Sequence, residues 1–135
     1  MTPRYVELEP GFSTADTRSL ELAFQRDILV LHFVDHTGET CVVEFTGTMA
    51  FRWSEDDDDD PSGLTRSDRV YEVEDSPWRA RLLKGRYAPP PLRHFKLCFN
   101  AMPDFLDVLA VAMKKKEPNQ TAQTTPGLRP SVSDL

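Results

Sequence analysis

The alternation of apolar and polar side chains predicts a chain built mainly of β-strands. The clearest stretch runs from Arg93 to Ala112. In its first part every second side chain is apolar, at Phe95, Leu97 and Phe99, which is the period of a half-buried strand. The sequence Asn-Ala-Met-Pro-Asp at 100–104 then supplies turn-forming residues. The chain is therefore expected to reverse at this point and return antiparallel.

The returning segment, Phe105 to Ala112, is apolar on both of its faces, as in a central strand that is covered from two sides. A helix is the alternative, because four of its apolar side chains also fit helical spacing: Leu106, Leu109, Ala110 and Met113. The turn immediately before the segment favours the strand. The resulting hairpin is the element around which the rest of the chain is expected to be organised.

Further short strands are expected on the same grounds earlier in the chain. They are Arg18–Phe24, Asp27–Asp35, Thr40–Thr46, Met49–Trp53 and Val70–Val73, the last of them at a sheet edge. The residues Asp35 to Gly38 read as a hairpin turn, in which Gly38 can take a positive φ angle. Gly47 suits a bulge or a bend between two strands.

One short helix is expected at Ser76–Lys84. The Ser76 side chain offers an oxygen to cap the first turn, and Pro77 fits the first helical position, where its missing N–H is no loss. Gly85 suits the end of the helix. Three side chains would form its buried stripe: Trp78, Leu82 and Leu83.

Together these elements predict an α+β fold that is mostly antiparallel β, as one twisted sheet or a small sandwich of about six strands with a short helix. Residues 18–113 are expected to form one globular domain, which is long enough to bury a core. Residues 1–17 contain two prolines and few periodic apolar positions and predict an irregular arm. Residues 114–135 are polar, proline-bearing and aperiodic, which is typical of a disordered tail.

The distribution of charge along the chain indicates more about its function than the overall composition does. The net charge is −6, and residues 1–113 carry 12 basic against 20 acidic side chains. Such a balance disfavours a nucleic-acid binder that neutralises phosphates. Six consecutive acids at 55–60 repel one another and predict a solvated loop. No basic leader and no apolar run of about 20 residues is visible, so we expect a cytoplasmic protein without membrane contact.

The acidic segment 55–75 is the expected partner-binding surface, because it holds ten acids and only two arginines and would attract a basic protein. The residues concerned are Glu55, Asp56, Asp57, Asp58, Asp59, Asp60, Asp68, Glu72, Glu74 and Asp75. An alternative is internal complementarity, since 76–102 contains basic side chains, including Arg79 and Arg93, and no acid.

Catalytic and metal-binding signatures are weak in this chain. It lacks a nucleophile-elbow motif, a phosphate-cradling glycine loop and the spacing of a calcium loop, so we expect no enzyme and no cofactor. A metal site can be drawn from His32, His36 and Cys41, but the spacing matches no zinc pattern, and partly buried histidines of a sheet are the simpler interpretation. Cys41 and Cys98 read as buried free thiols.

A resemblance appears in the second half of the chain, over about 70–112. Asp75, Ser76 and Trp78 are followed by Arg93, His94 and Phe95, then by Asn100, Asp107 and Val108. This pattern resembles small bacterial accessory proteins of the immunity type, which are encoded beside toxin or phage genes. The resemblance implies no catalytic residue, and Asp75, Trp78, Arg93 and His94 could equally tie the helix to the hairpin.

We therefore expect a small acidic protein-binding module, most plausibly an immunity-type protein that neutralises a basic effector or toxin. One alternative is a structural subunit that assembles through exposed sheet edges, as a homodimer for example. Another is a small enzyme that uses His94 with Asp75 or Cys98.

Overall fold

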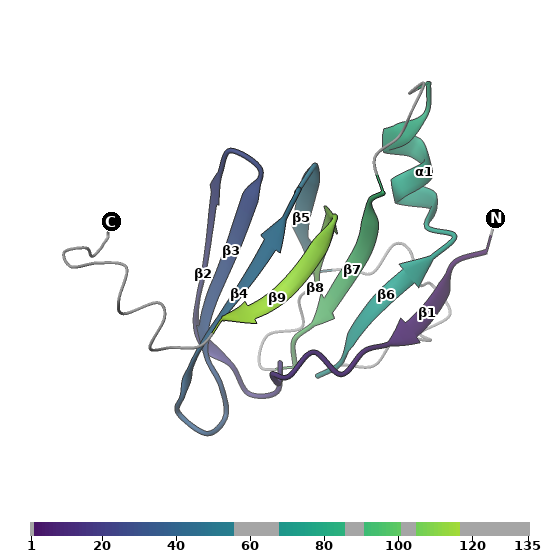
Figure 1. The fold of residues 1–135 in the computed structure, drawn as a ribbon. Helices are drawn as coiled ribbons and strands as arrows, with labels where there is room; N and C mark the ends of the chain where they lie inside the picture. The colour runs from purple at the N-terminus through teal and green to yellow at the C-terminus, as the bar shows by residue number, and fades with distance from the viewer. Residues whose placement is uncertain (1, 56–67, 86–90, 101–104, 117–135) are drawn as a thin grey trace.

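The structure is a computed structural model that describes residues 2–55, 68–85, 91–100 and 105–116. Within these ranges the chain forms nine strands and one short helix, and every neighbouring pair of strands is antiparallel. The predicted α+β class with mostly antiparallel sheet is confirmed. The strands divide into two sheets (Figure 1). The described residues form nine strands, which is more than the roughly six that the sequence predicted.

The five-stranded sheet has the order β1-β6-β7-β8-β5. Its strands are β1 (Arg4–Glu7), β6 (Val70–Glu74), β7 (Arg93–Cys98), β8 (Phe105–Ala110) and β5 (Ala50–Ser54). The four-stranded sheet has the order β2-β3-β4-β9. It consists of β2 (Arg18–Gln25), β3 (Ile28–Val34), β4 (Thr40–Thr46) and β9 (Ala112–Lys116), and helix α1 (Pro77–Leu83) follows β6.

The predicted central hairpin is present as β7 and β8. Phe95 pairs with Val108 and Leu97 pairs with Leu106 in an antiparallel register. Strand β8 lies between β7 and β5, so the apolar character of both its faces reflects a covered central strand, and the helical alternative is wrong. The expected turn at 101–104 lies outside the described residues.

Two chain segments cross between the sheets side by side at Gly47 and Val111. Strand β4 continues past Gly47 into β5, and β8 continues past Val111 into β9. The Val111 N–H donates to the Thr46 carbonyl at 2.9 Å, and the Met49 N–H donates to the Leu109 carbonyl at 2.8 Å. Gly47 has a φ angle of +63°, and a Cβ atom there would lie 2.6 Å from Val111 Cγ2. The expected bend at Gly47 is therefore confirmed, and only glycine fits it.

The core lies between the facing sides of the two sheets. It consists of Leu29, Leu31, Phe33, Cys41, Val43, Phe45, Val70, Phe95, Leu97, Phe99, Leu106, Val108 and Ala110. Aromatic pairs join the sheets: the ring centroids of Phe33 and Phe99 are 6.2 Å apart, and those of Phe45 and Phe95 are 6.0 Å apart. Burial of such rings is a main source of stability in a domain of this size.

The N-terminal arm was wrongly predicted to be irregular. Residues Arg4–Glu7 form β1, which pairs with β6, and the rings of Tyr5 and Tyr71 meet at 6.2 Å. Strand β6 is consequently an interior strand and not the predicted edge. A four-residue strand is too short to show a clear period in the sequence, and its pairing with β6 defines it instead.

The other end of the domain also departs from the prediction. Residues 114–116, which were assigned to the disordered tail, belong to β9 and pair with β4. These three lysines extend β9 at the edge of the four-stranded sheet. The Lys116 ammonium lies 3.5 Å from the Glu44 carboxylate on β4. The remainder of the tail, 117–135, lies outside the described residues.

Helix α1 begins as predicted. The Ser76 Oγ accepts a hydrogen bond from the Arg79 N–H at 3.1 Å, and Pro77 occupies the first turn. The helix buries Trp78 and Leu83, whereas Leu82, which was expected in the buried stripe, is 38% exposed. With seven residues, α1 is far too short to cross a membrane, and no other described segment forms a helix of the length and apolarity a span requires.

Candidate functional site

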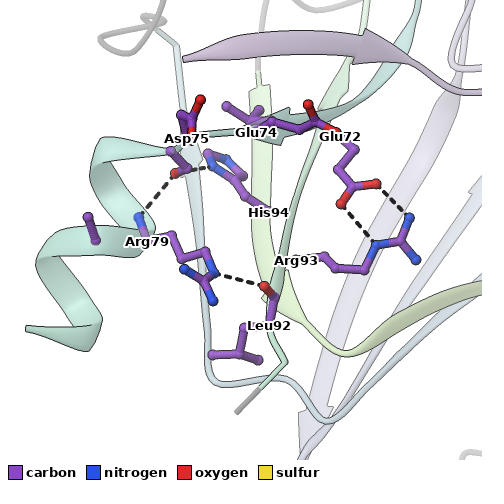
Figure 2. A pocket seen from close by; sticks show the side chains of 10 residues that line it. Glu72, Glu74, Asp75, Arg79, Leu92, Arg93 and His94 are labelled. Atoms are coloured by element: carbon purple, nitrogen blue, oxygen red, sulfur yellow. Dashed lines mark hydrogen bonds and ion pairs between the residues drawn. The ribbon is translucent and has the colours of Figure 1, made fainter. Parts of the chain in front are cut away.

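A cavity of about 290 Å³ lies where the end of β6, the start of α1 and the start of β7 meet (Figure 2). Three of the predicted partner-binding acids line it: Glu72, Glu74 and Asp75. Asp75 is exposed and has a φ angle of 55°, which places it at the sharp turn from β6 into the helix. The fold thus gathers part of the predicted acidic surface around one opening.

Arginines neutralise much of this acidity within the molecule. Arg93 binds Glu72 through two hydrogen bonds of 2.6 and 3.0 Å, and Arg4 binds Glu74. The hydrogen bond from Arg93 lowers the pKa of Glu72 and outweighs the opposing effect of its partial burial. The predicted alternative of internal complementarity is confirmed for Glu72 and Arg93.

The remaining predicted acids lie away from the cavity or outside the described residues. Asp68 pairs with Arg69, which also reaches Glu7. Glu55 is exposed just beyond the end of β5. Asp56, Asp57, Asp58, Asp59 and Asp60 lie outside the described residues. The ten acids therefore do not all line one described surface.

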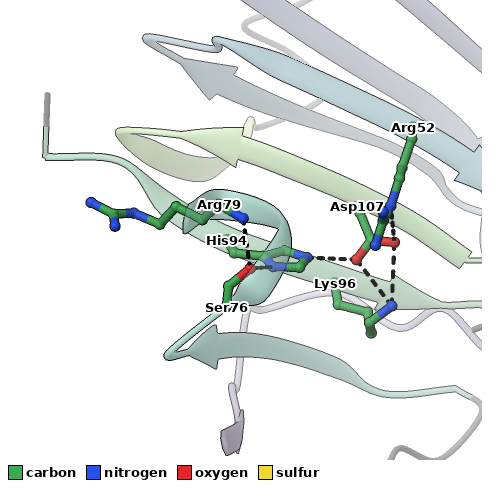
Figure 3. Close-up of polar contacts among 6 residues, drawn as sticks. All are labelled: Arg52, Ser76, Arg79, His94, Lys96 and Asp107. Carbon is green, nitrogen blue, oxygen red and sulfur yellow. Dashed lines mark hydrogen bonds and ion pairs between the residues drawn. The ribbon is translucent and has the colours of Figure 1, made fainter. Parts of the chain in front are cut away.

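A buried chain of polar side chains runs inward from the cavity wall (Figure 3). The Ser76 Oγ lies 2.7 Å from His94 Nδ1, and His94 Nε2 lies 2.6 Å from Asp107 Oδ1. Asp107 is also bound by the Lys96 ammonium at 3.0 Å and by Arg52 Nε at 3.2 Å. Ser76, His94, Lys96 and Asp107 are all buried.

Strand register explains how these side chains meet. Asp107 on β8 stands directly opposite Lys96 on β7 and directly opposite Arg52 on β5, so it has a cation on each side. These residues lie on the face of the five-stranded sheet that points away from the core, because Phe95, Leu97, Leu106 and Val108 point into it. Cross-strand neighbours on one face of a sheet are close enough to pair.

Trp78 covers this network from the helix. Its ring meets the His94 ring edge-on at a centroid distance of 5.1 Å, and the Arg52 guanidinium lies 4.3 Å from the Trp78 ring centroid. Trp78 and His94 therefore do tie the helix to the hairpin, which was one of the two roles expected for them. Arg93 and Asp75 belong to the cavity rim instead.

Burial and hydrogen bonding set the charge states of the network. Burial lowers the pKa of His94, and this effect exceeds the opposing influence of its hydrogen bond to Asp107. Burial on its own would raise the pKa of Asp107, but the hydrogen bond from His94 and the charges of Lys96 and Arg52 hold it below the ordinary value. At neutral pH a neutral imidazole therefore lies between a hydroxyl group and a carboxylate.

The predicted pairing of His94 with Asp75 or Cys98 was wrong. Both ring nitrogens of His94 are engaged by Ser76 and Asp107, so neither Asp75 nor Cys98 is its hydrogen-bond partner. One signal was present in the sequence: Asp107 is the only charged side chain in the apolar segment 105–112. A charge at such a position has to be paired when the strand is buried.

The metal site suggested by His32, His36 and Cys41 does not form. No group of three potential metal ligands occurs in the part of the chain that the structure describes. His32 is half-buried in β3, as expected, whereas His36 is exposed because it belongs to the turn before β4. Cys41 and Cys98 are buried free thiols, as predicted.

Asp35 holds the turn that separates β3 from β4. Its carboxylate accepts hydrogen bonds from the Thr37 hydroxyl at 2.6 Å and from the Glu39 N–H at 3.0 Å. These bonds, led by that from Thr37, lower the pKa of Asp35 to about 2. Burial, together with the nearby Asp35 charge, raises the pKa of Cys41 to about 11, which makes it a poor nucleophile at neutral pH.

Comparison of the chain with protein family models, curated proteins and solved structures found no match. The resemblance to immunity-type proteins therefore rests on the sequence pattern.

Proposed function

We propose that this chain is a protein-binding module that recognises a basic partner, and that it acts as an immunity-type protein neutralising a basic effector or toxin. The observation that carries the proposal is the placement of Glu72, Glu74 and Asp75 around one cavity. Together with the other seven acids between residues 55 and 75, these carboxylates would attract a cationic surface and orient it toward the cavity.

The cavity has room for one side chain of a partner. Its volume of about 290 Å³ lies just below the range of roughly 300 to 1,000 Å³ that is typical of small-molecule sites. A lysine or arginine side chain of the partner would reach the carboxylates and place its apolar stem against Ala80 and Leu92, which also line the cavity.

The internal ion pairs at the rim do not prevent such binding. The side chains of Arg4 and Glu74 are 73% and 41% exposed, and ion pairs of this kind contribute only about 0–1 kcal/mol. A partner guanidinium can therefore share or replace Arg4 at Glu74 with little loss. Desolvation on binding would strengthen the new pair.

The test removes two rim charges and follows association. In the variant Glu74→Gln/Asp75→Asn, we expect the association rate with a basic protein that co-purifies with the wild-type chain to fall roughly threefold to tenfold at low salt, and the difference to shrink as salt is raised. The matched control is Glu21→Gln/Glu39→Gln, which removes the same charge from exposed positions of the four-stranded sheet side. Equal association rates for the two variants would contradict the proposal.

A second candidate function, assembly through sheet edges, is favoured by one observation. Phe24 on edge strand β2 and Phe51 on edge strand β5 are 47% and 38% exposed, and their ring centroids lie 5.5 Å apart. A second copy could cover this pair. We would then expect sedimentation equilibrium to show a dimer that Phe24→Ser/Phe51→Ser converts to monomer, whereas a monomeric wild-type chain at high concentration would exclude it.

A further inference from the structure

The hydrogen-bond directions in the buried network assign its protons. Ser76 Oγ accepts from the Arg79 N–H at 3.1 Å, and its own hydrogen is then available for His94 Nδ1 at 2.7 Å. His94 Nε2 faces the Asp107 carboxylate at 2.6 Å, where only a donor is favourable. The neutral imidazole is thus protonated on Nε2 and presents the lone pair of Nδ1 to the serine hydroxyl.

We propose that Ser76, His94 and Asp107 form a nucleophile system at the cavity, able to attack the acyl carbon of a small ester. The arrangement has the same order of groups as a Ser–His–Asp triad, with the two ring nitrogens exchanged. The exchange leaves the chemistry unchanged, because either nitrogen can accept the proton while the other donates to the carboxylate.

Two of the three residues lie at the cavity wall. Ser76 and His94 both line the cavity, whereas Asp107 lies behind His94 and has no exposed surface (Figures 2 and 3). Ser76 and His94 are thus the catalytic residues, and Asp107 is a positioning residue. Lys96 and Arg52 keep Asp107 ionised, so that it can stabilise the imidazolium that forms.

The acyl-transfer step balances with the groups present. Ser76 Oγ forms a bond to the acyl carbon while its proton moves to His94 Nδ1. The bond from the acyl carbon to the leaving oxygen then breaks, and the same proton passes from Nδ1 to that oxygen as the alcohol departs. Water repeats the sequence, releases the acid and restores the Ser76 hydroxyl.

The cavity lining indicates the class of ester. Its volume of about 290 Å³ admits only a small molecule, and Glu74 and Asp75 favour one that carries a positive charge. Arg79 also lies on the wall, where its Nε donates to the Leu92 carbonyl at 2.8 Å, so the cavity lining carries positive as well as negative charge.

The test uses the isolated full chain, without any partner, and a small fluorophosphonate as the probe. Attack by Ser76 forms an Oγ–P bond and releases fluoride, and the added mass is located by peptide mass spectrometry. We expect an adduct at Ser76 and none at the exposed Ser19, which serves as an internal control for unactivated hydroxyls. Absence of an adduct at Ser76 under conditions that label a known serine hydrolase would overturn the proposal, whatever the folding of any variant.

The pH dependence of the labelling rate distinguishes attack by Ser76 with His94 as general base from attack by an unassisted serine hydroxyl. Because the pKa of His94 is lowered, labelling of Ser76 should be constant at and above the ordinary histidine pKa of about 6.5 and should fall only at lower pH. In His94→Gln, shown by circular dichroism to be folded, the labelling rate should drop at least about 100-fold. A wild-type rate that rises tenfold per pH unit without a plateau would also overturn the proposal, because it would indicate attack without a base.

This inference does not depend on the proposed binding function. Labelling of Ser76 is measured on the isolated wild-type chain, whereas partner association is measured on the wild type, the Glu74→Gln/Asp75→Asn variant and its control. A wild-type chain that is labelled at Ser76 but shows no rim-dependent association, or that shows such association but is not labelled, would support one proposal and contradict the other. The two proposals can therefore fail separately.

Discussion

At the scale of single residues, Asp107 is the buried carboxylate whose pairing depends most on the fold. Its carboxylate has no exposed surface and accepts hydrogen bonds from His94, Lys96 and Arg52. A buried charge is tolerated only when such partners replace its lost hydration. The stability of the outer side of the five-stranded sheet therefore depends on the pairing being complete.

Removing the charge of Asp107 should expose this dependence. We expect Asp107→Asn to lower the free energy of unfolding by about 3–5 kcal/mol, because Lys96 is left buried without its carboxylate. The double variant Lys96→Met/Asp107→Leu should recover much of the loss, since apolar groups of similar volume replace the pair. Urea denaturation measures both variants, and a double variant that is less stable than the single one would contradict this account.

His94 should make stability depend on pH in a known direction. Its pKa in the folded state lies below the ordinary value of about 6.5, so the unfolded chain binds more protons and stability falls as the pH drops through that value. The stabilisation is fully present above a pH of about 6.5 and is lost progressively toward the folded-state pKa.

The groups that face His94 are Ser76 from the start of α1, Asp107 from β8 and, more distantly, the cations Lys96 and Arg52. Because His94→Gln cannot titrate, the slope of its unfolding free energy between pH 7 and pH 5 should be shallower than that of the wild type. Equal slopes by chemical denaturation would show that His94 does not carry the effect.

At the scale of elements, the crossing at Gly47 decides how the two sheets are joined. A residue with a Cβ atom at this position would be strained by the positive φ angle and would also collide with Val111. The two neighbouring chain segments, which run from β4 into β5 and from β8 into β9, could then bend side by side only with difficulty.

We expect Gly47→Ala to destabilise the protein by roughly 2–4 kcal/mol, the sum of backbone strain and overpacking. Gly38→Ala is the matched control, because Gly38 has a φ angle of +90° but nothing lies within 4 Å of a Cβ atom there. It should lose only about 1–2 kcal/mol from strain. Adding Val111→Ala to Gly47→Ala should restore part of the stability, and failure to do so would show that the contact is not limiting.

At the scale of the whole molecule, the two faces of the five-stranded sheet should unfold together. Trp53 stacks on Phe99 at a centroid distance of 5.6 Å on the core side, and Trp78 packs on His94 on the opposite side. These two residues are the only tryptophans of the chain. They can therefore report separately on the core and on the attachment of α1.

In Trp53→Phe the fluorescence reports on Trp78, and in Trp78→Phe it reports on Trp53. For each variant we expect the urea midpoint from fluorescence to coincide with that from far-ultraviolet circular dichroism, as in a two-state transition. A fluorescence midpoint for Trp78 that precedes the loss of strand signal would mean that α1 detaches before the sheets unfold.

Local patterns were sufficient to locate most elements. The hairpin β7–β8, the turn from Asp35 to Gly38 and the helix start at Ser76 followed from periodicity and from turn and cap chemistry, which act over a few residues. The short strand β1 was missed because only its pairing with β6 defines it. The first three residues of the segment 114–135 were placed in the tail for the same reason: the strand with which they pair, β4, lies far away in the sequence.

By itself, the sequence determined the antiparallel β-rich class, the capped helix and the acidic charge, because each depends on neighbouring residues. Only the tertiary structure decided which sheet each strand joins and which groups surround His94. Arg52 and Asp107 are 55 residues apart, and Ser76 and His94 are 18 apart. Strand register brings such residues together, and register depends on the packing of whole faces that no local pattern specifies.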